Sequence, residues 1–118
     1  MAVLTVQTVV DAGIVPSLAA VNASDTFADD GSGRTFLEVA NASGGSINVT
    51  ITAVQTSANI PGVGSVTISD IVVAVANGAR KFIGPFTTAY RNSSGLVTAG
   101  YSGTSSVTAG AFKVAKED

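Results

Sequence analysis

Alternation of apolar and polar residues is the dominant pattern along this chain. The clearest case is SINVTIT at residues 46–52, in which Ile47, Val49 and Ile51 alternate with polar residues. A period of two places the two sets of side chains on opposite faces of a β-strand. Similar stretches predict seven further strands, at residues 3–10, 34–40, 66–75, 79–83, 85–90, 96–102 and 107–114. Eight short strands in succession predict an all-β fold, either a sandwich or a barrel.

The segments between these strands carry turn signals. Asn77-Gly78 lies between two strand patterns, and both residues tolerate the positive φ of a type I′ hairpin, which would place Val73 opposite Phe82. The apolar phase shifts within residues 66–75, which predicts a bend near Ser69-Asp70 and a strand shared between two sheets. Residues 57–64, SANIPGVG, are predicted to form an exposed loop.

The N-terminal region departs from the alternating pattern. We predict an N-terminal arm or edge strand at residues 1–24 and a β-sandwich domain at residues 25–118. Pro16 and the small residues after it leave two alternatives for residues 13–24, an extended arm or one short helix that begins at Pro16. The N-terminus shows neither a cationic segment nor a continuous apolar run, so we expect no signal peptide, no membrane partner and synthesis in a host cytoplasm.

Charge is scarce in this chain and is scattered. Charged residues make up 12% of the sequence, about half of the usual ~25%. A surface so poor in charge is typical of one that is covered by other protein. No basic face that could bind nucleic acid emerges from the six cations, which are Arg34, Arg80, Lys81, Arg91, Lys113 and Lys116.

The residue types that commonly carry chemistry are missing. The sequence has no histidine and no cysteine, so the usual general bases, thiol nucleophiles and zinc ligands are absent, and we expect neither an enzyme nor a cofactor. Asp25, Asp29 and Asp30, in DTFADDGSG, could supply oxygen ligands to calcium. Their spacing is not that of an EF-hand, and the favoured alternative is a solvated loop in which Asp30 and Gly31 form the turn.

The bulkiest side chains concentrate in RKFIGPF at residues 80–86. In a strand, Phe82 and Ile83 point to opposite faces, and Pro85 ends the hydrogen-bonded ladder because proline has no N–H group. Phe86 is then expected to take a new direction as the chain crosses between two sheets. Either both faces of this strand are covered by the protein itself, or one face is a docking surface.

Three segments, DTFADDGSGRTFLEVANASGGSINVTIT, NGARKFIGPF and YRNSSGLVTAGYSGTSSVTAGAFKV, occur in an order that resembles the small all-β head decoration, or cement, proteins of tailed bacteriophages. The resemblance covers roughly residues 25–114. It implies a jelly-roll-like antiparallel β-sandwich of about eight strands with an extended N-terminal arm. It also implies a structural virion protein that binds the outer surface of an expanded capsid, with the major capsid protein and its own copies, as a homotrimer, for partners.

The resemblance further implies which residues lie at or under an interface with the capsid or a neighbouring subunit. These are four residues of an arm or edge strand and four of the RKFIGPF corner: Val3, Leu4, Val6, Val9, Phe82, Ile83, Pro85 and Phe86. The alternative function is a host-surface or glycan-binding β-module on a virion or tail fibre. Sugar-binding modules usually stack sugars on exposed aromatics, and this chain has no tryptophan and only Tyr90 and Tyr101 as tyrosines.

Overall fold

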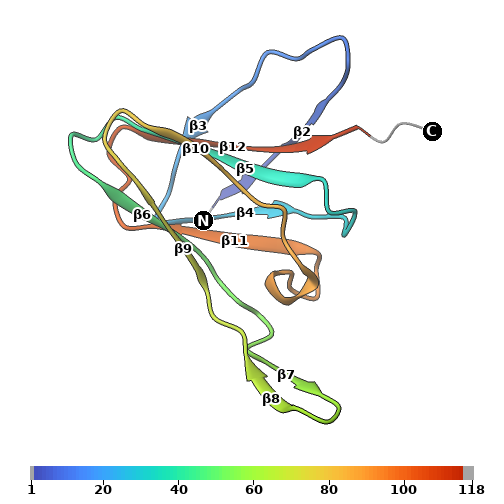
Figure 1. Cartoon of the computed structure of the whole chain (residues 1–118). Helices are drawn as coiled ribbons and strands as arrows, with labels where there is room; N and C mark the ends of the chain where they lie inside the picture. The colour runs from blue at the N-terminus through green and yellow to red at the C-terminus, as the bar shows by residue number, and fades with distance from the viewer. Residues whose placement is uncertain (1, 116–118) are drawn as a thin grey trace.

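The computed structural model describes residues 2–115, which form β-strands and one 3₁₀ helix, η1 (Thr88–Tyr90) (Figure 1). The strands are β1 (Ala2–Leu4), β2 (Val6–Val9), β3 (Ala19–Ala20), β4 (Ser24–Ala28), β5 (Thr35–Asn41), β6 (Ile47–Ile51), β7 (Ser57–Ile60), β8 (Gly64–Thr67), β9 (Ile71–Val75), β10 (Arg80–Ile83), β11 (Leu96–Tyr101) and β12 (Val107–Val114). The prediction of an all-β fold is confirmed.

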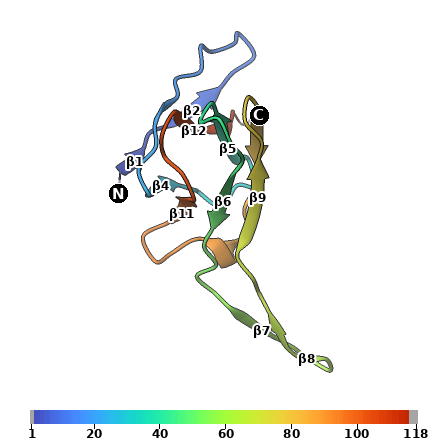
Figure 2. The same ribbon diagram turned by 90° about the vertical axis from the view of Figure 1, so that its left-hand side faces the viewer.

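Two five-stranded sheets face each other in a sandwich-like arrangement (Figures 1 and 2). Sheet A has the order β1-β4-β11-β6-β9, and sheet B has the order β10-β5-β12-β2, with β3 also paired to β12. β7 and β8 form a separate two-stranded sheet, the β7–β8 hairpin, which projects from the body.

The predicted strand number and the purely antiparallel pairing are wrong. The structure has twelve strands instead of about eight, and β1 with β4 and β2 with β12 are parallel pairs. The parallel pairs arise because β1 and β2 are successive parts of the N-terminal stretch, and neither is joined to its partner by a tight hairpin, the connection that makes neighbours antiparallel.

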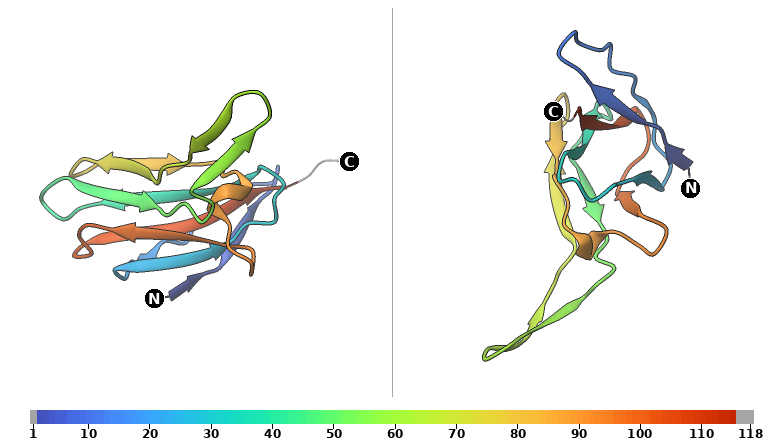
Figure 3. Two further views of the ribbon diagram at one scale, coloured as in Figure 1. Left: turned by 90° about the horizontal axis from the view of Figure 1, so that it is seen from below. Right: turned by 90° about the vertical axis from the view of Figure 1, so that its right-hand side faces the viewer.

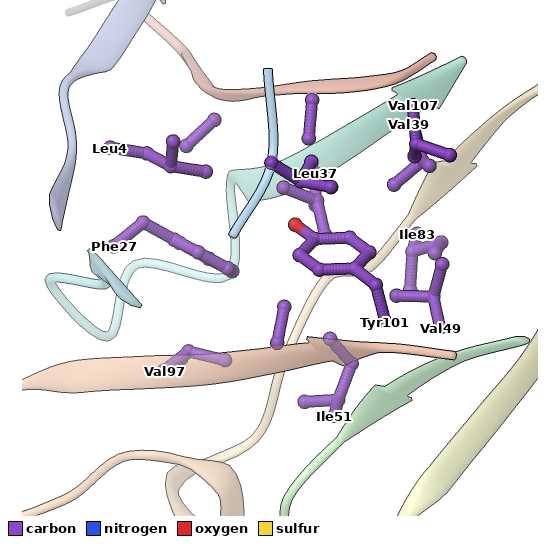
Figure 4. Packing of buried hydrophobic residues seen from close by; sticks show 14 of the residues in the cluster. Leu4, Phe27, Leu37, Val39, Val49, Ile51, Ile83, Val97, Tyr101 and Val107 are labelled. Atoms are coloured by element: carbon purple, nitrogen blue, oxygen red, sulfur yellow. The ribbon is translucent and has the colours of Figure 1, made fainter. Parts of the chain in front are cut away.

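The inward faces of the two sheets form a single hydrophobic core (Figure 4). Ile47, Val49 and Ile51 of β6 are buried while Asn48 is exposed, as the alternation predicts. Sheet A contributes Phe27 and Val97, and sheet B contributes the core residues Leu37, Val39, Val107, Ala109 and Ala111. The alternation in β6 therefore corresponds to a strand with one face in the core.

The predicted hairpin at Asn77-Gly78 is wrong. The turn exists, but it carries the chain from β9 in sheet A to β10 in sheet B, so Val73 lies opposite Val49 and Phe82 opposite Glu38. Gly78 has a φ of 82°, whereas Asn77 is not among the residues with positive φ, so the turn is not type I′. The turn is bonded to β5 instead, through the N–H of Gly78 donating to the Asn41 carbonyl (2.7 Å) and the N–H of Asn41 donating to the Ala79 carbonyl (3.0 Å).

The shift of apolar phase within residues 66–75 predicts a bend near Ser69-Asp70, and the structure has a break between two strands there. β8 ends at Thr67 and β9 begins at Ile71, and the two strands belong to different sheets, which confirms the prediction. The exposure predicted at residues 57–64 is confirmed, but the predicted loop is wrong, because β7 pairs with β8 from Ser57 opposite Thr67 to Ile60 opposite Gly64. Gly62 and Gly64 supply the positive φ values, 80° and 106°, near the tip of this hairpin.

The strand predicted at residues 85–90 is also wrong. β10 ends at Ile83, and Pro85 follows a cis peptide bond with Gly84. The chain then turns through η1 and crosses from sheet B to β11 in sheet A, so the predicted change of direction at Phe86 is confirmed. Strand pairing is replaced here by bonds from the N–H groups of residues 54 and 55 to the carbonyl of Ala89.

Residues 13–24 contain no helix. The chain between β2 and β3 runs over the outer face of sheet B, where an added Cβ on Gly110 would lie 2.8 Å from Leu18 and from the Ser17 carbonyl (Figure 3). β1 and β2 pair with β4 and β12 of the same chain. No helix within residues 2–115 has the length and apolar character needed to span a bilayer.

Candidate functional site

Three phenylalanines gather on the outer face of sheet B. Phe36 of β5 stacks on Phe112 of β12, with ring centroids 5.6 Å apart and an interplanar angle of 21°. Phe82 of β10 meets Phe36 edge-on, at 5.5 Å and 83°. Both geometries are favourable for aromatic pairs. Phe112 is buried, but Phe82 remains 71% exposed, so the cluster holds a large apolar ring out in solvent.

Phe82 lines two neighbouring hollows in this face. The larger has a volume of about 500 Å³ and is lined by Gly33, Arg34, Thr35, Phe36, Phe82, Gly84, Pro85 and Val114. The smaller has a volume of about 270 Å³ and is lined by Val9, Ile14, Pro16, Phe36, Glu38, Phe82 and Phe112. We call the exposed apolar area around the larger hollow, formed by Phe36, Phe82, Pro85 and Val114, the Phe82 surface.

Residues of the RKFIGPF corner lie on both faces of sheet B. Phe82 and Pro85 line the hollow on the outer face, and Ile83 and Phe86 anchor the corner in the core. Ile83 pairs with Leu37 and is buried in the core. At Gly84, φ is 138° and an added Cβ would lie 3.1 Å from the Cα of Phe36, so only glycine fits there. Phe86 turns back into the core, where its ring lies 5.6 Å from that of Phe27.

The predicted interface residues therefore separate into exposed and buried sets. At the corner, Phe82 and Pro85 are exposed, whereas Ile83 and Phe86 belong to the core beneath them. At the N-terminus, Val3 is 70% exposed and Leu4 is a core residue (Figure 4). The remaining two, Val6 and Val9, are half-buried on β2.

Cations border the Phe82 surface. Arg80 and Lys81 precede Phe82 on β10, and Arg34 lines the larger hollow. Arg80 forms an ion pair with Glu38, whose side chain is almost fully buried under this face. Arg34 therefore adds a positive charge beside the apolar hollow, whereas the charge of Arg80 is balanced by Glu38 and Lys81 alternates with Phe82 along β10. One cation beside an apolar centre favours partners that are neutral or acidic there.

The three aspartates considered as calcium ligands have separate partners. Asp25 lies inside the sandwich on β4, not in the predicted solvated loop, and its carboxylate accepts hydrogen bonds from the side-chain amide (3.1 Å) and backbone N–H (3.3 Å) of Asn22. Asp29 accepts from the N–H of Gly31, which has a positive φ at the predicted turn. Hydrogen bonds from Ser32 and the ion pair with Lys113 hold the pKa of Asp30 below its usual range.

These positions do not form a metal site. Within residues 2–115, no three side chains of aspartate, glutamate, histidine or cysteine gather so that they could hold an ion. The solvated-loop prediction fails for residues 25–28 because Phe27 packs in the core and draws its neighbours into a strand.

A second group of exposed apolar residues was missed by sequence reasoning. Five exposed large apolar residues lie between the end of β6 and β9: Val54, Ile60, Val63, Val66 and Val72. A signal for these exposed residues is present in the sequence, because Asp70 is the only charged residue between Glu38 and Arg80. Because residues 57–64 were predicted to form an ordinary loop, the scarcity of charge in this region did not lead to a prediction of exposed apolar side chains.

Neither tyrosine is freely exposed. Tyr101 is buried, and its burial, followed by the negative charge of Asp25, raises the pKa of its hydroxyl. Tyr90 is half-buried and donates its hydroxyl hydrogen bond to the Ser69 carbonyl (2.9 Å). These rings offer no open stacking platform for a sugar.

The fold and its surfaces define an all-β, sandwich-like protein with exposed apolar areas. Comparison with known proteins finds no matching protein family, no matching curated protein and no matching solved structure.

Proposed function

We propose that this protein is a structural component of a bacteriophage virion that binds the outer surface of the capsid and stabilises it. The observation that carries the proposal is Phe82, an aromatic ring that is 71% exposed beside an apolar hollow of about 500 Å³. Leaving such a side chain in water forgoes roughly 1.5–3 kcal/mol of burial free energy. A partner that covers the Phe82 surface would recover this free energy.

The chemistry of this surface suits the major capsid protein as that partner. Phenylalanine and arginine are both enriched at protein interfaces, and here Phe82 lies beside Arg80 and Arg34. An apolar side chain of the shell would occupy the hollow, and acidic groups would face the cations around it. Binding across the joints between capsomers would resist separation of the shell by contact alone, without chemistry.

The resemblance to phage decoration proteins supplies the remainder of the proposal. We propose accordingly that the sandwich is related to jelly-roll-like folds. We also propose that the protein prefers expanded shells and forms homotrimers on the capsid surface. The sandwich-like arrangement of two sheets is compatible with such a relationship.

Binding to purified shells tests the proposal. The protein should co-sediment with expanded capsids of its parent phage and give density on them in electron microscopy, while unexpanded shells remain bare. Phe82→Ala should reduce binding at least tenfold, whereas Val15→Ala, at a very exposed valine that lines neither hollow, should leave it unchanged. Absence of binding to both shell forms would reject the proposal, and hits on a glycan array would then favour a glycan-binding module.

A further inference from the structure

The outer edge of sheet A is an unprotected β-strand. β9 has the sequence IVVAV and pairs with β6 on one side, while no strand within residues 2–115 pairs with its other side. Proteins commonly protect such edges with charges, prolines or bulges, because free N–H and C=O groups recruit further strands. β9 carries none of these, and Val72 on its exposed face is 60% exposed.

The neighbouring edge of sheet B shows the protection that β9 lacks. β10 is also an outermost strand, but it carries Arg80 and Lys81. Two copies of β10 placed antiparallel would bring four cations into one short ribbon, which is unfavourable. The contrast shows that β9 lacks the charges that would oppose its pairing with a second copy of itself.

We propose that two copies of this chain associate by antiparallel pairing of their β9 strands across a two-fold axis. The register that overlaps Ile71–Val75 completely places Val73 opposite Val73 of the second copy and Val72 opposite Ala74. Every cross-strand pair is then apolar and mostly β-branched, which stabilises antiparallel ribbons. The result is one continuous ten-stranded sheet made from the two A sheets.

The single charge near this edge does not oppose the pairing. Asp70 would lie opposite Ala76 of the second copy, so the two aspartates stand at opposite ends of the ribbon, roughly 20 Å apart at 3.4 Å per residue. Its carboxylate already accepts a hydrogen bond from the N–H of Ala53 (2.8 Å). The pairing therefore keeps the two Asp70 carboxylates apart.

The β7–β8 hairpin enlarges the contact. Five paired residues alone fall short of the roughly 800 Å² per partner that a stable interface buries. An isolated two-stranded ribbon is at best marginally stable in water, and most residues of this one are exposed. Each hairpin leaves its β9 at the Asp70 end, which the two-fold axis sets beside the uncharged turn at Ala76 and Asn77 of the second copy.

Molar mass in solution tests the pairing without any capsid. Light scattering or sedimentation should give twice the chain mass at micromolar concentrations. Val72→Lys should raise the dissociation constant at least tenfold, whereas Val3→Lys, the same substitution at a valine of similar exposure on the opposite edge of sheet A, should not change it. Far-UV circular dichroism confirms that both variants remain folded.

A cysteine cross-link tests the register. The chain has no cysteine, so a Val73→Cys variant offers a single thiol, which should form a covalent dimer on mild oxidation, while Val3→Cys should stay uncross-linked. A monomer at all concentrations would overturn the proposal. A trimer disrupted equally by Val72→Lys and Val3→Lys would also overturn it, in favour of head-to-tail pairing of β9 with β1. Because no shell is involved, these outcomes do not depend on whether the chain binds a capsid. A dimer in solution would, however, count against the homotrimer that the resemblance implies.

Discussion

The side chain of Gln7 holds the backbone of Ser17 through two hydrogen bonds. Its Nε2 donates to the Ser17 carbonyl (2.7 Å), and its Oε1 accepts from the Ser17 N–H (2.8 Å). This arrangement imitates the pairing of a neighbouring strand. It fixes the segment between β2 and β3 against the protein's own sheet B.

Removing residues 1–12 should therefore destabilise the fold. The deletion takes away β1 and β2 and removes Leu4 from the core. Loss of a buried leucine side chain alone costs about 2–5 kcal/mol. Thermal unfolding followed by circular dichroism should show a large fall in Tm, and an unchanged Tm would mean that this stretch is a detachable arm.

The Gln7 contact can be tested separately. Gln7→Ala removes two hydrogen bonds and should cost about 1–2 kcal/mol in free energy of unfolding. Thr8→Ala, at the exposed neighbouring position of β2, serves as the control and should cost less than about 0.5 kcal/mol. Equal effects of the two substitutions in urea denaturation would contradict the role assigned to Gln7.

Gly110→Ala should displace the segment that covers sheet B. The new methyl group would lie 2.8 Å from Leu18 and from the Ser17 carbonyl, a distance that forces the segment to move. We expect a loss of about 1–3 kcal/mol, typical of overpacking. Gly45→Ala is the matched control, because a Cβ there meets nothing within 4 Å, and it should leave the denaturation midpoint almost unchanged.

Phe82 and Phe86 should lose very different amounts of stability on truncation. Phe86→Ala opens a cavity beside Phe27 and should cost about 3–5 kcal/mol of stability. Phe82→Ala removes a largely exposed ring and should cost less than about 1 kcal/mol, although it weakens shell binding. A comparable loss of stability in both variants would show that Phe82 is primarily a structural residue.

Tyr101 should make the fold sensitive to alkali. Burial raises the pKa of its hydroxyl above the ordinary value of 10.0, so the folded state holds the proton more tightly than the unfolded state does. Its contribution to stability is complete below pH 10 and is lost as the pH rises above that value. Unfolding between pH 8 and 12 should show a smaller alkaline loss in Tyr101→Phe than in the unchanged protein, and parallel curves would refute this assignment.

Sequence periodicity predicted the strands that have one face in the core. Ile47, Val49 and Ile51 are examples, because burial on one side imposes a period of two. It could not find β4, where one large apolar residue, Phe27, lies among polar ones, or the β7–β8 hairpin, which lies outside the core. Periodicity detects alternation of apolar with polar residues, so it misses both a strand that buries polar residues, as β4 buries Asp25 and Thr26, and a strand that lies outside the core.

The candidate site was predicted only in part. The sequence pointed to the RKFIGPF corner and to a change of direction at Pro85, and both lie beside the observed hollow. The sequence could not show that Phe82 is exposed to solvent and that Phe86 lies in the core. The position of each ring depends on which strand lies next to β10. Asn77-Gly78 suggested β9 as that neighbour, whereas the pairing is with β5.

The parallel pairing of β2 with β12 also determines how the protein carries load. Val6 to Val9 run beside Ala111 to Val114, so the first and last long segments of the chain lie side by side and point the same way. A pull that separates the two ends of the molecule slides these strands along each other and loads all their backbone bonds at once. Such a shear geometry shares the load among several backbone bonds, whereas strands pulled apart from one end would lose those bonds one at a time.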